Sequence, residues 1–179
     1  ILVSGETRVV SAIADNTHLT VTVAFTDVAN DTSPELVQGD YNATASSGWN
    51  GGVLGGVAIL NNGVDIPQMM GTANDAKMEA LSNWLGNTTC QVMRPFRNFL
   101  VALDVTTSSV RYPFRVRWSH PAEGGTVTWD SSDATKDAGY VDLSQSAGFV
   151  IDCLPLGDTN IIYKEDSIWS MSFEGGQSI

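Results

Sequence analysis

Two adjacent β-prone runs constrain the fold of this chain more than any other feature. Residues 99–105 form a nearly continuous apolar run, which has the length and composition of a buried strand. Residues 114–118 alternate strictly, with apolar side chains on one face and Arg115 and Arg117 on the other, as in a half-buried strand. The polar residues 106–109 lie between the two runs and predict a turn. The stretch therefore predicts an antiparallel pair of strands.

Composition favours an all-β chain. The 179 residues are 42% hydrophobic and 16% charged, so the chain is long and apolar enough to bury a core. Its 17 glycines and its many small polar residues indicate frequent turns between short antiparallel strands. No run approaches the roughly 18 apolar residues of a membrane span, so we expect no membrane segment.

The net charge of −11 disfavours nonspecific binding to nucleic acid, because phosphate binding depends on cationic side chains. The same charge is consistent with ordinary solubility, or with a surface past which DNA moves without adhering.

Three more hairpins are predicted from alternating or apolar runs that flank polar turns. The second of them turns at Asn61-Asn62-Gly63, because Asn-Gly is a strong hairpin signal. The paired runs are residues 8–13 with 18–25, residues 57–60 with 64–70, and residues 160–163 with 167–173. Residues 98–102 and 159–163 also resemble each other weakly, and each precedes a polar turn and a strand with a tryptophan. Their offset of about 60 residues is compatible with propeller blades that carry a loop insertion.

One short helix is predicted near residues 75–85. Asn74 or Asp75 can cap its N-terminus, and Gly86 suits its C-terminus. Its expected apolar stripe consists of Met78, Leu81 and Leu85, with Trp84 beside them.

The predicted organisation has three parts. Residues 1–27 form a β-hairpin segment, residues 28–56 form a loop or linker rich in Gly, Ser and Asn, and residues 57–179 form a propeller-like β domain. We expect this domain to be incomplete and the chain to be a fragment of a longer polypeptide. The glycines of residues 51–56 lack the strand, helix and lysine of a phosphate-binding loop, so they predict bends and close backbone packing instead.

No catalytic, cofactor-binding or metal site is predicted. His18 and His120 belong to no nucleophile motif, and Cys90 and Cys153 are expected to be buried free thiols, although a disulfide is possible. A cluster of carboxylates lies in one polar loop, and the simplest interpretation is that these side chains are exposed to solvent. Two alternatives are that they catalyse glycoside hydrolysis beside Trp118 and Trp129, or that they bind Ca²⁺. The carboxylates are Asp130, Asp133, Asp137 and Asp142.

Five of the nine basic residues lie between residues 94 and 117 of this acidic chain. They can form ion pairs within the chain, or they can lie at a seam between subunits. The candidate subunit-contact residues are Arg94, Arg97, Arg111, Arg115 and Arg117.

Several short motifs, taken in order, resemble the tail nozzle proteins of short-tailed bacteriophages, which are also named tail tubular or stabilisation proteins. The resemblance covers roughly residues 57–179. Its motifs lie in residues 57–67, 93–103, 116–121, 128–130, 137–139, 161–169 and 175–176.

This resemblance implies a structural virion protein without enzyme activity. The implied subunit contains a β-propeller and assembles as a homohexameric tube in the phage tail. Its partners would be a tail adaptor protein and tail fibres or spikes, and DNA would pass through it during ejection without specific binding. The alternative from the residues themselves is a carbohydrate- or receptor-binding β module of a virion or secreted protein.

Overall fold

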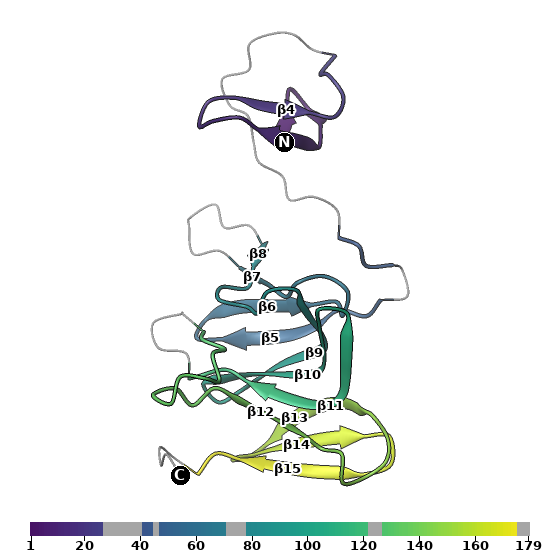
Figure 1. Cartoon of the computed structure of the whole chain (residues 1–179), viewed down its shortest axis with the longest axis vertical. Coiled ribbons are helices and arrows are strands. Elements are labelled where there is room, and N and C mark those ends of the chain that lie inside the picture. The colour runs from purple at the N-terminus through teal and green to yellow at the C-terminus, as the bar shows by residue number, and fades with distance from the viewer. Residues whose placement is uncertain (27–40, 45–46, 71–77, 122–126, 175–179) are drawn as a thin grey trace. The chain divides into compact units, whose positions relative to one another are not determined.

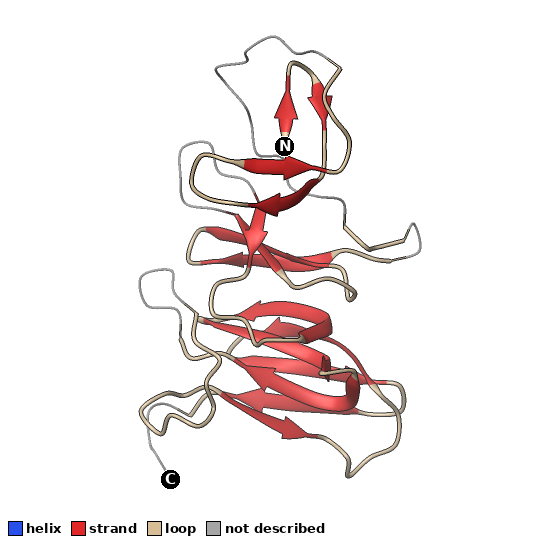
Figure 2. Ribbon diagram, turned by 45° about the horizontal axis from the view of Figure 1, so that its top comes forward, coloured by secondary structure: helices blue, strands red, loops and turns tan. Residues whose placement is uncertain are grey.

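The computed structural model describes residues 1–26, 41–44, 47–70, 78–121 and 127–174 (Figure 1). All regular structure in these ranges consists of β-strands, every strand pairing is antiparallel, and none of it is helix (Figure 2). The prediction of an all-β chain built from antiparallel hairpins is therefore confirmed. The chain divides into two compact units, Ile1–Tyr41 and Asn42–Ile179.

The first unit contains two small hairpins. Strand β1 (Leu2–Val3) pairs with β2 (Glu6–Thr7), and β3 (Val10–Ile13) pairs with β4 (Leu19–Val21). The second pairing confirms the hairpin predicted from residues 8–25, although both strands are shorter than the runs in the sequence. None of residues 1–26 is buried, so this described part of the unit has no apolar core of its own.

The second unit contains three sheets in which strands adjacent in sequence are adjacent in space. The first sheet comprises β5 (Asn50–Leu54), β6 (Val57–Asn61), β7 (Gln68–Met70) and β8 (Met78–Ala80). The middle sheet comprises β9 (Thr88–Phe96), β10 (Phe99–Thr107), β11 (Val110–Trp118) and β12 (Gly139–Asp142). The third sheet comprises β13 (Val150–Leu156), β14 (Thr159–Lys164) and β15 (Ile168–Ser172).

The hairpins predicted around residues 106–109, 61–63 and 164–166 are thus β10–β11, β6–β7 and β14–β15. The two similar sequence segments occupy equivalent places, because β10 and β14 are each the second strand of a sheet. No sheet closes on itself among the described residues, so the propeller stays a prediction.

The middle sheet is buried on both faces, which explains the continuous apolar run in β10. Leu100 and Ala102 pack in one cluster with residues of the first sheet, whereas Val101 and Leu103 pack in a second cluster with residues of the third sheet. Alternate side chains of a strand point to opposite faces, so a strand between two sheets must be apolar at every position.

The predicted helix is wrong in its described part. Residues 78–80 form β8, in which Glu79 pairs with Met69 of β7, and the Leu81 amide donates to the Pro67 carbonyl at 2.7 Å. A positive φ of 55° at Asn83 then turns the chain. The helical spacing of the apolar residues misled the prediction, because the strand and the turn after it also bury Leu81. Residues 74–77, with the predicted caps, lie outside the described residues.

Strand β5 lies within the predicted loop of residues 28–56. A Cβ at Gly51 would lie 2.0 Å from the Ile59 carbonyl oxygen, and one at Gly52 would lie 2.6 Å from Cγ of Pro95. The glycines therefore allow close backbone packing, as predicted. Across the described ranges, the structure contains no helix with the length and apolar character needed to cross a membrane.

Candidate functional site

Four of the five candidate arginines form separate ion pairs within the second unit. Arg94 of β9, in the middle sheet, also contacts strands of the first and third sheets. Its Nε and Nη2 donate to the two carboxylate oxygens of Asp152 on β13 at 2.9 and 2.8 Å, and its Nη1 donates to the Gly51 carbonyl on β5 at 3.3 Å. Arg94 therefore links the first strands of three successive sheets. A bidentate guanidinium–carboxylate pair also fixes orientation, which a single hydrogen bond does not.

Two further bidentate pairs hold the middle sheet together. Arg111 donates to Asp104 at 2.8 and 2.5 Å, and Arg115 donates to Asp142 of β12 at 2.8 and 2.7 Å. The Arg115 guanidinium also lies 3.9 Å from the ring centre of Tyr112. Hydrogen bonds to the aspartates raise the pKa of both arginines, and Arg115 in turn lowers the pKa of the Asp142 carboxyl. The Arg115–Asp142 pair is therefore charged at neutral pH.

The remaining two candidate arginines differ from these. Arg97 pairs with Asp158 at 2.9 Å near the surface, where the carboxylate side chain is 96% exposed. Arg117 is half-buried and donates from Nη2 to the Trp129 carbonyl at 2.8 Å. Burial and the neighbouring Arg115 lower the pKa of Arg117.

Intrachain pairing thus accounts for four of the five arginines: Arg94, Arg97, Arg111 and Arg115. This is the local alternative that the sequence left open. The role of the five residues in subunit contacts stays a prediction.

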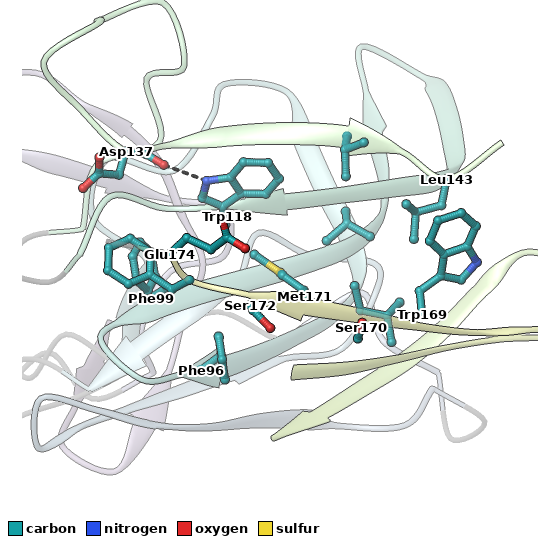
Figure 3. A pocket seen from close by; sticks show the side chains of 14 residues that line it. Phe96, Phe99, Trp118, Asp137, Leu143, Trp169, Ser170, Met171, Ser172 and Glu174 are labelled. Atoms are coloured by element: carbon teal, nitrogen blue, oxygen red, sulfur yellow. Dashed lines mark hydrogen bonds between the residues drawn. The ribbon is translucent and has the colours of Figure 1, made fainter. Parts of the chain in front are cut away.

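A second feature is an apolar groove of about 670 Å³ between the middle and third sheets (Figure 3). Trp118 is fixed at one side, because its Nε1 donates to the Asp137 carbonyl at 2.6 Å. Trp169 and Met171 of β15 line the other side. Phe99 and Phe173 also line the groove, with their ring centres 5.0 Å apart. We name this feature the aromatic groove.

The aromatic groove was not among the features predicted from the sequence. Alternation in residues 168–172 was a usable signal, because it places Trp169 and Met171 on one face of β15. The position of that face beside β11 and β12 depends on sheet stacking, which the sequence pattern does not specify.

The acidic loop is organised by local hydrogen bonds. Asp130 accepts from the backbone amide and hydroxyl of Ser132, and Asp133 does the same with Thr135. These bonds lower the pKa of both carboxyls. Within the described residues, no three His, Cys, Asp or Glu side chains come together as metal ligands. Trp129 is only 1% exposed, so it cannot serve as a sugar platform.

The two cysteines are free and buried, as predicted, and lie in different apolar clusters. Burial raises the pKa of the Cys90 thiol, and it raises the pKa of Cys153 to about 11. Both groups are therefore protonated near neutral pH, and neither has the thiolate character of a reactive cysteine.

Comparison of the sequence with protein-family models and with curated proteins finds no match.

Proposed function

We propose that this chain is part of a structural virion protein of a phage tail nozzle and forms part of the wall of the channel through which DNA is ejected. The observation that supports this most is the order of its sheets. Three successive antiparallel sheets, each built from strands adjacent in sequence, are linked through their first strands by Arg94. Propeller blades have this organisation, and the resemblance implies a propeller.

The proposed role is mechanical. A channel wall must resist deformation while DNA passes, and rigid interfaces come from dense packing and from oriented polar contacts. Residues 99–105 of β10 are all buried, which anchors the middle sheet against both neighbours. The Arg94–Asp152 pair adds a directional link between β9 and β13.

Charge supports the same proposal. A net charge of −11 produces a surface that repels phosphate groups, so DNA that passes the protein adheres weakly. The acidic loop contributes exposed carboxylates at Asp130 and Asp137. The proposed protein would assemble as a hexamer, contact a tail adaptor protein and tail fibres or spikes, and act in the virion without enzymatic chemistry.

Light scattering after size-exclusion chromatography, followed by electron microscopy, tests the proposal. We expect rings or tubes with a central channel. Arg97→Glu should weaken assembly because this arginine is partly exposed, whereas Lys136→Glu makes the same charge change outside the five arginines and should leave assembly intact. A protein that stays monomeric at every concentration and forms no ring would contradict the proposal.

The alternative is a carbohydrate- or receptor-binding β module. The observation in its favour is the aromatic groove, where Trp118 lies near the carboxylates of Asp137 and Glu174. Ligand sites commonly combine an apolar lining with a few polar groups. A glycan array with and without Ca²⁺ separates the two functions, because a nozzle wall is expected to bind no specific glycan.

A further inference from the structure

Two side chains at the end of β11 hold the loop that leads into β12. Both contacts are made to the backbone of one loop residue, Asp137. Its amide donates to Nδ1 of His120 at 2.9 Å. Its carbonyl accepts from Nε1 of Trp118 at 2.6 Å (Figure 3). The positions of the loop, of His120 and of Trp118 therefore depend on one another.

The contact with Asp137 fixes the proton on the His120 ring. A backbone amide can only donate, so Nδ1 must be the acceptor, and the neutral imidazole carries its proton on Nε2. Histidine is the residue type whose charge changes between about pH 5 and about pH 8. When Nδ1 gains a proton, two donors face each other and the hydrogen bond is lost. The observed contact thus belongs to the neutral form of His120.

The carboxylate of Asp137 supplies an acceptor for the charged form. Its Oδ2 lies 3.7 Å from Nδ1 of His120. A hydrogen bond between charged partners is about 2.8 Å long, so the two atoms must approach by about 1 Å. The His120 backbone is anchored, because its amide donates to the Thr128 carbonyl at 2.8 Å and the preceding Ser119 is fully buried. The exchange of acceptors therefore moves Asp137 rather than the end of β11.

A second carboxylate of the same loop lies near His120. Hydrogen bonds from Thr135 lower the pKa of Asp133, and Lys136 and His120 add smaller electrostatic contributions in the same direction. Asp133 and Asp137 both attract an imidazolium, whereas the Thr128 carbonyl that meets the His120 backbone carries no net charge. The charges of this loop thus favour movement toward His120 when the ring is protonated.

Trp118 depends on the same loop for its position. A Cβ at Gly139 would lie 2.6 Å from Cζ2 of Trp118, so the indole packs closely against the backbone of β12. The Asp137 carbonyl is the hydrogen-bond partner that orients this indole in the wall of the aromatic groove. A movement of Asp137 therefore changes the groove on the side that Trp118 forms.

We propose that His120 is a pH-dependent switch that controls the loop of residues 130–138 and, through it, the position of Trp118 in the aromatic groove. In the neutral form, Nδ1 accepts from the Asp137 amide and the indole is held. In the protonated form, Nδ1 donates to the Asp137 carboxylate, and the Asp137 carbonyl moves away from Trp118. This inference does not depend on the proposed nozzle function.

Nuclear magnetic resonance of the full chain, labelled with ¹⁵N, tests the switch. Long-range ¹H–¹⁵N spectra show which imidazole nitrogen of His120 carries the proton, and Trp118→Phe assigns the indole resonance of Trp118. Above the transition we expect the proton on Nε2. Between about pH 8 and about pH 5, we expect the Trp118 indole resonance to shift with the same midpoint as the His120 nitrogens.

His120→Gln should remove the transition and keep Trp118 at its high-pH position, because the glutamine oxygen can accept from the Asp137 amide and does not titrate in this range. His18→Gln is the matched control. His18 is the other histidine of the chain, and its side chain is 74% exposed beside Asp15 in the first unit, so this variant should keep the transition.

Asp137→Asn separates the switch from a purely structural role of His120. This variant keeps the backbone amide and carbonyl but removes the carboxylate, so the midpoint of the Trp118 transition should move to lower pH. The proposal would be overturned by a proton on Nδ1 above the transition, or by a Trp118 resonance that does not follow His120. Persistence of the transition in His120→Gln, or an unchanged midpoint in Asp137→Asn, would overturn it as well. The measurements on the unmodified chain decide the question even if His120→Gln does not fold.

Discussion

At the scale of single residues, Asp104 changes which face of β10 the following residues occupy. It lies in the middle of an apolar run, is 3% exposed, and has a positive φ of 50°. The register with β11 shifts between Leu103 and Val105, and these two residues belong to different apolar clusters. The irregularity at Asp104 therefore moves Val105 to the opposite face. The bidentate contact with Arg111 holds the buried carboxylate.

Replacing Asp104 should cost stability through this contact. Asp104→Asn keeps a residue that tolerates positive φ but removes the charge, so we expect a loss of about 1–3 kcal/mol in the free energy of unfolding. Asp158→Asn removes the exposed partner of Arg97 and should cost less than about 1 kcal/mol. Urea denaturation monitored by tryptophan fluorescence measures both values. Equal losses in the two variants would contradict the structural importance of the Asp104 pair.

The Arg115–Asp142 pair should make stability depend on pH in acid. Arg115 lowers the pKa of Asp142 in the folded chain. The stabilisation that this pair gives the folded chain is therefore fully present above about pH 4, the pKa of an aspartate in the unfolded chain. It is lost as the pH falls through the lower pKa that Asp142 has in the folded chain. The Asp142 side chain is 41% exposed, so the effect should stay below about 1 kcal/mol. Asp142→Asn should lose less stability than the unmodified chain between pH 5 and pH 2, roughly the range in which carboxylates titrate. Parallel pH profiles for the two proteins would exclude this contribution.

At the scale of elements, the turn between β10 and β11 contains removable strain. Ser108 and Ser109 both have positive φ, at 48° and 67°, a conformation that Asn and Gly adopt more readily. Ser108→Asn with Ser109→Gly should raise the free energy of unfolding by about 0.5–1 kcal/mol. The β5–β6 turn offers the reverse control: Gly55 and Gly56 have φ of 57° and 83°, so changing both to serine should destabilise. Thermal unfolding of both variants measures the effect, and shifts of the same sign would contradict it.

The sequence specifies some of these elements and not others. The β10–β11 hairpin was predictable because its apolar run and alternating partner are local signals. Strand β9 was not predicted, since Arg94 and Pro95 interrupt its alternation, and residues 78–85 have a spacing that fits a helix as well as a strand followed by a turn. The ion pairs could not be assigned from sequence, because Arg94 and Asp152 lie 58 positions apart and meet only through sheet stacking. The aromatic groove could not be predicted from the sequence for the same reason, because it forms only where the middle and third sheets stack.

At the scale of the whole molecule, the two units differ in how they are stabilised. The second unit buries two apolar clusters, one on each side of the middle sheet. The first unit has no buried residue in its described part, and Val9, Ile13 and Val23 are 68%, 77% and 62% exposed. Small hairpins without a covered apolar face are marginal in water. The cooperative unfolding transition should therefore belong to the second unit.

A chain that begins at Asn42 tests this division. Because both apolar clusters and the four carboxylate pairs of the candidate arginines lie beyond that residue, the shortened chain should keep its melting temperature within about 2 °C of the full chain. Leu103→Ala in the full chain is the positive control, since removing this fully buried side chain should cost about 2–5 kcal/mol. Near-ultraviolet circular dichroism follows the packing of the tryptophans during heating. The prediction would be contradicted if the shortened chain lost its cooperative transition while Leu103→Ala kept it. Residues 1–41 would then stabilise the second unit, although their apolar side chains are exposed.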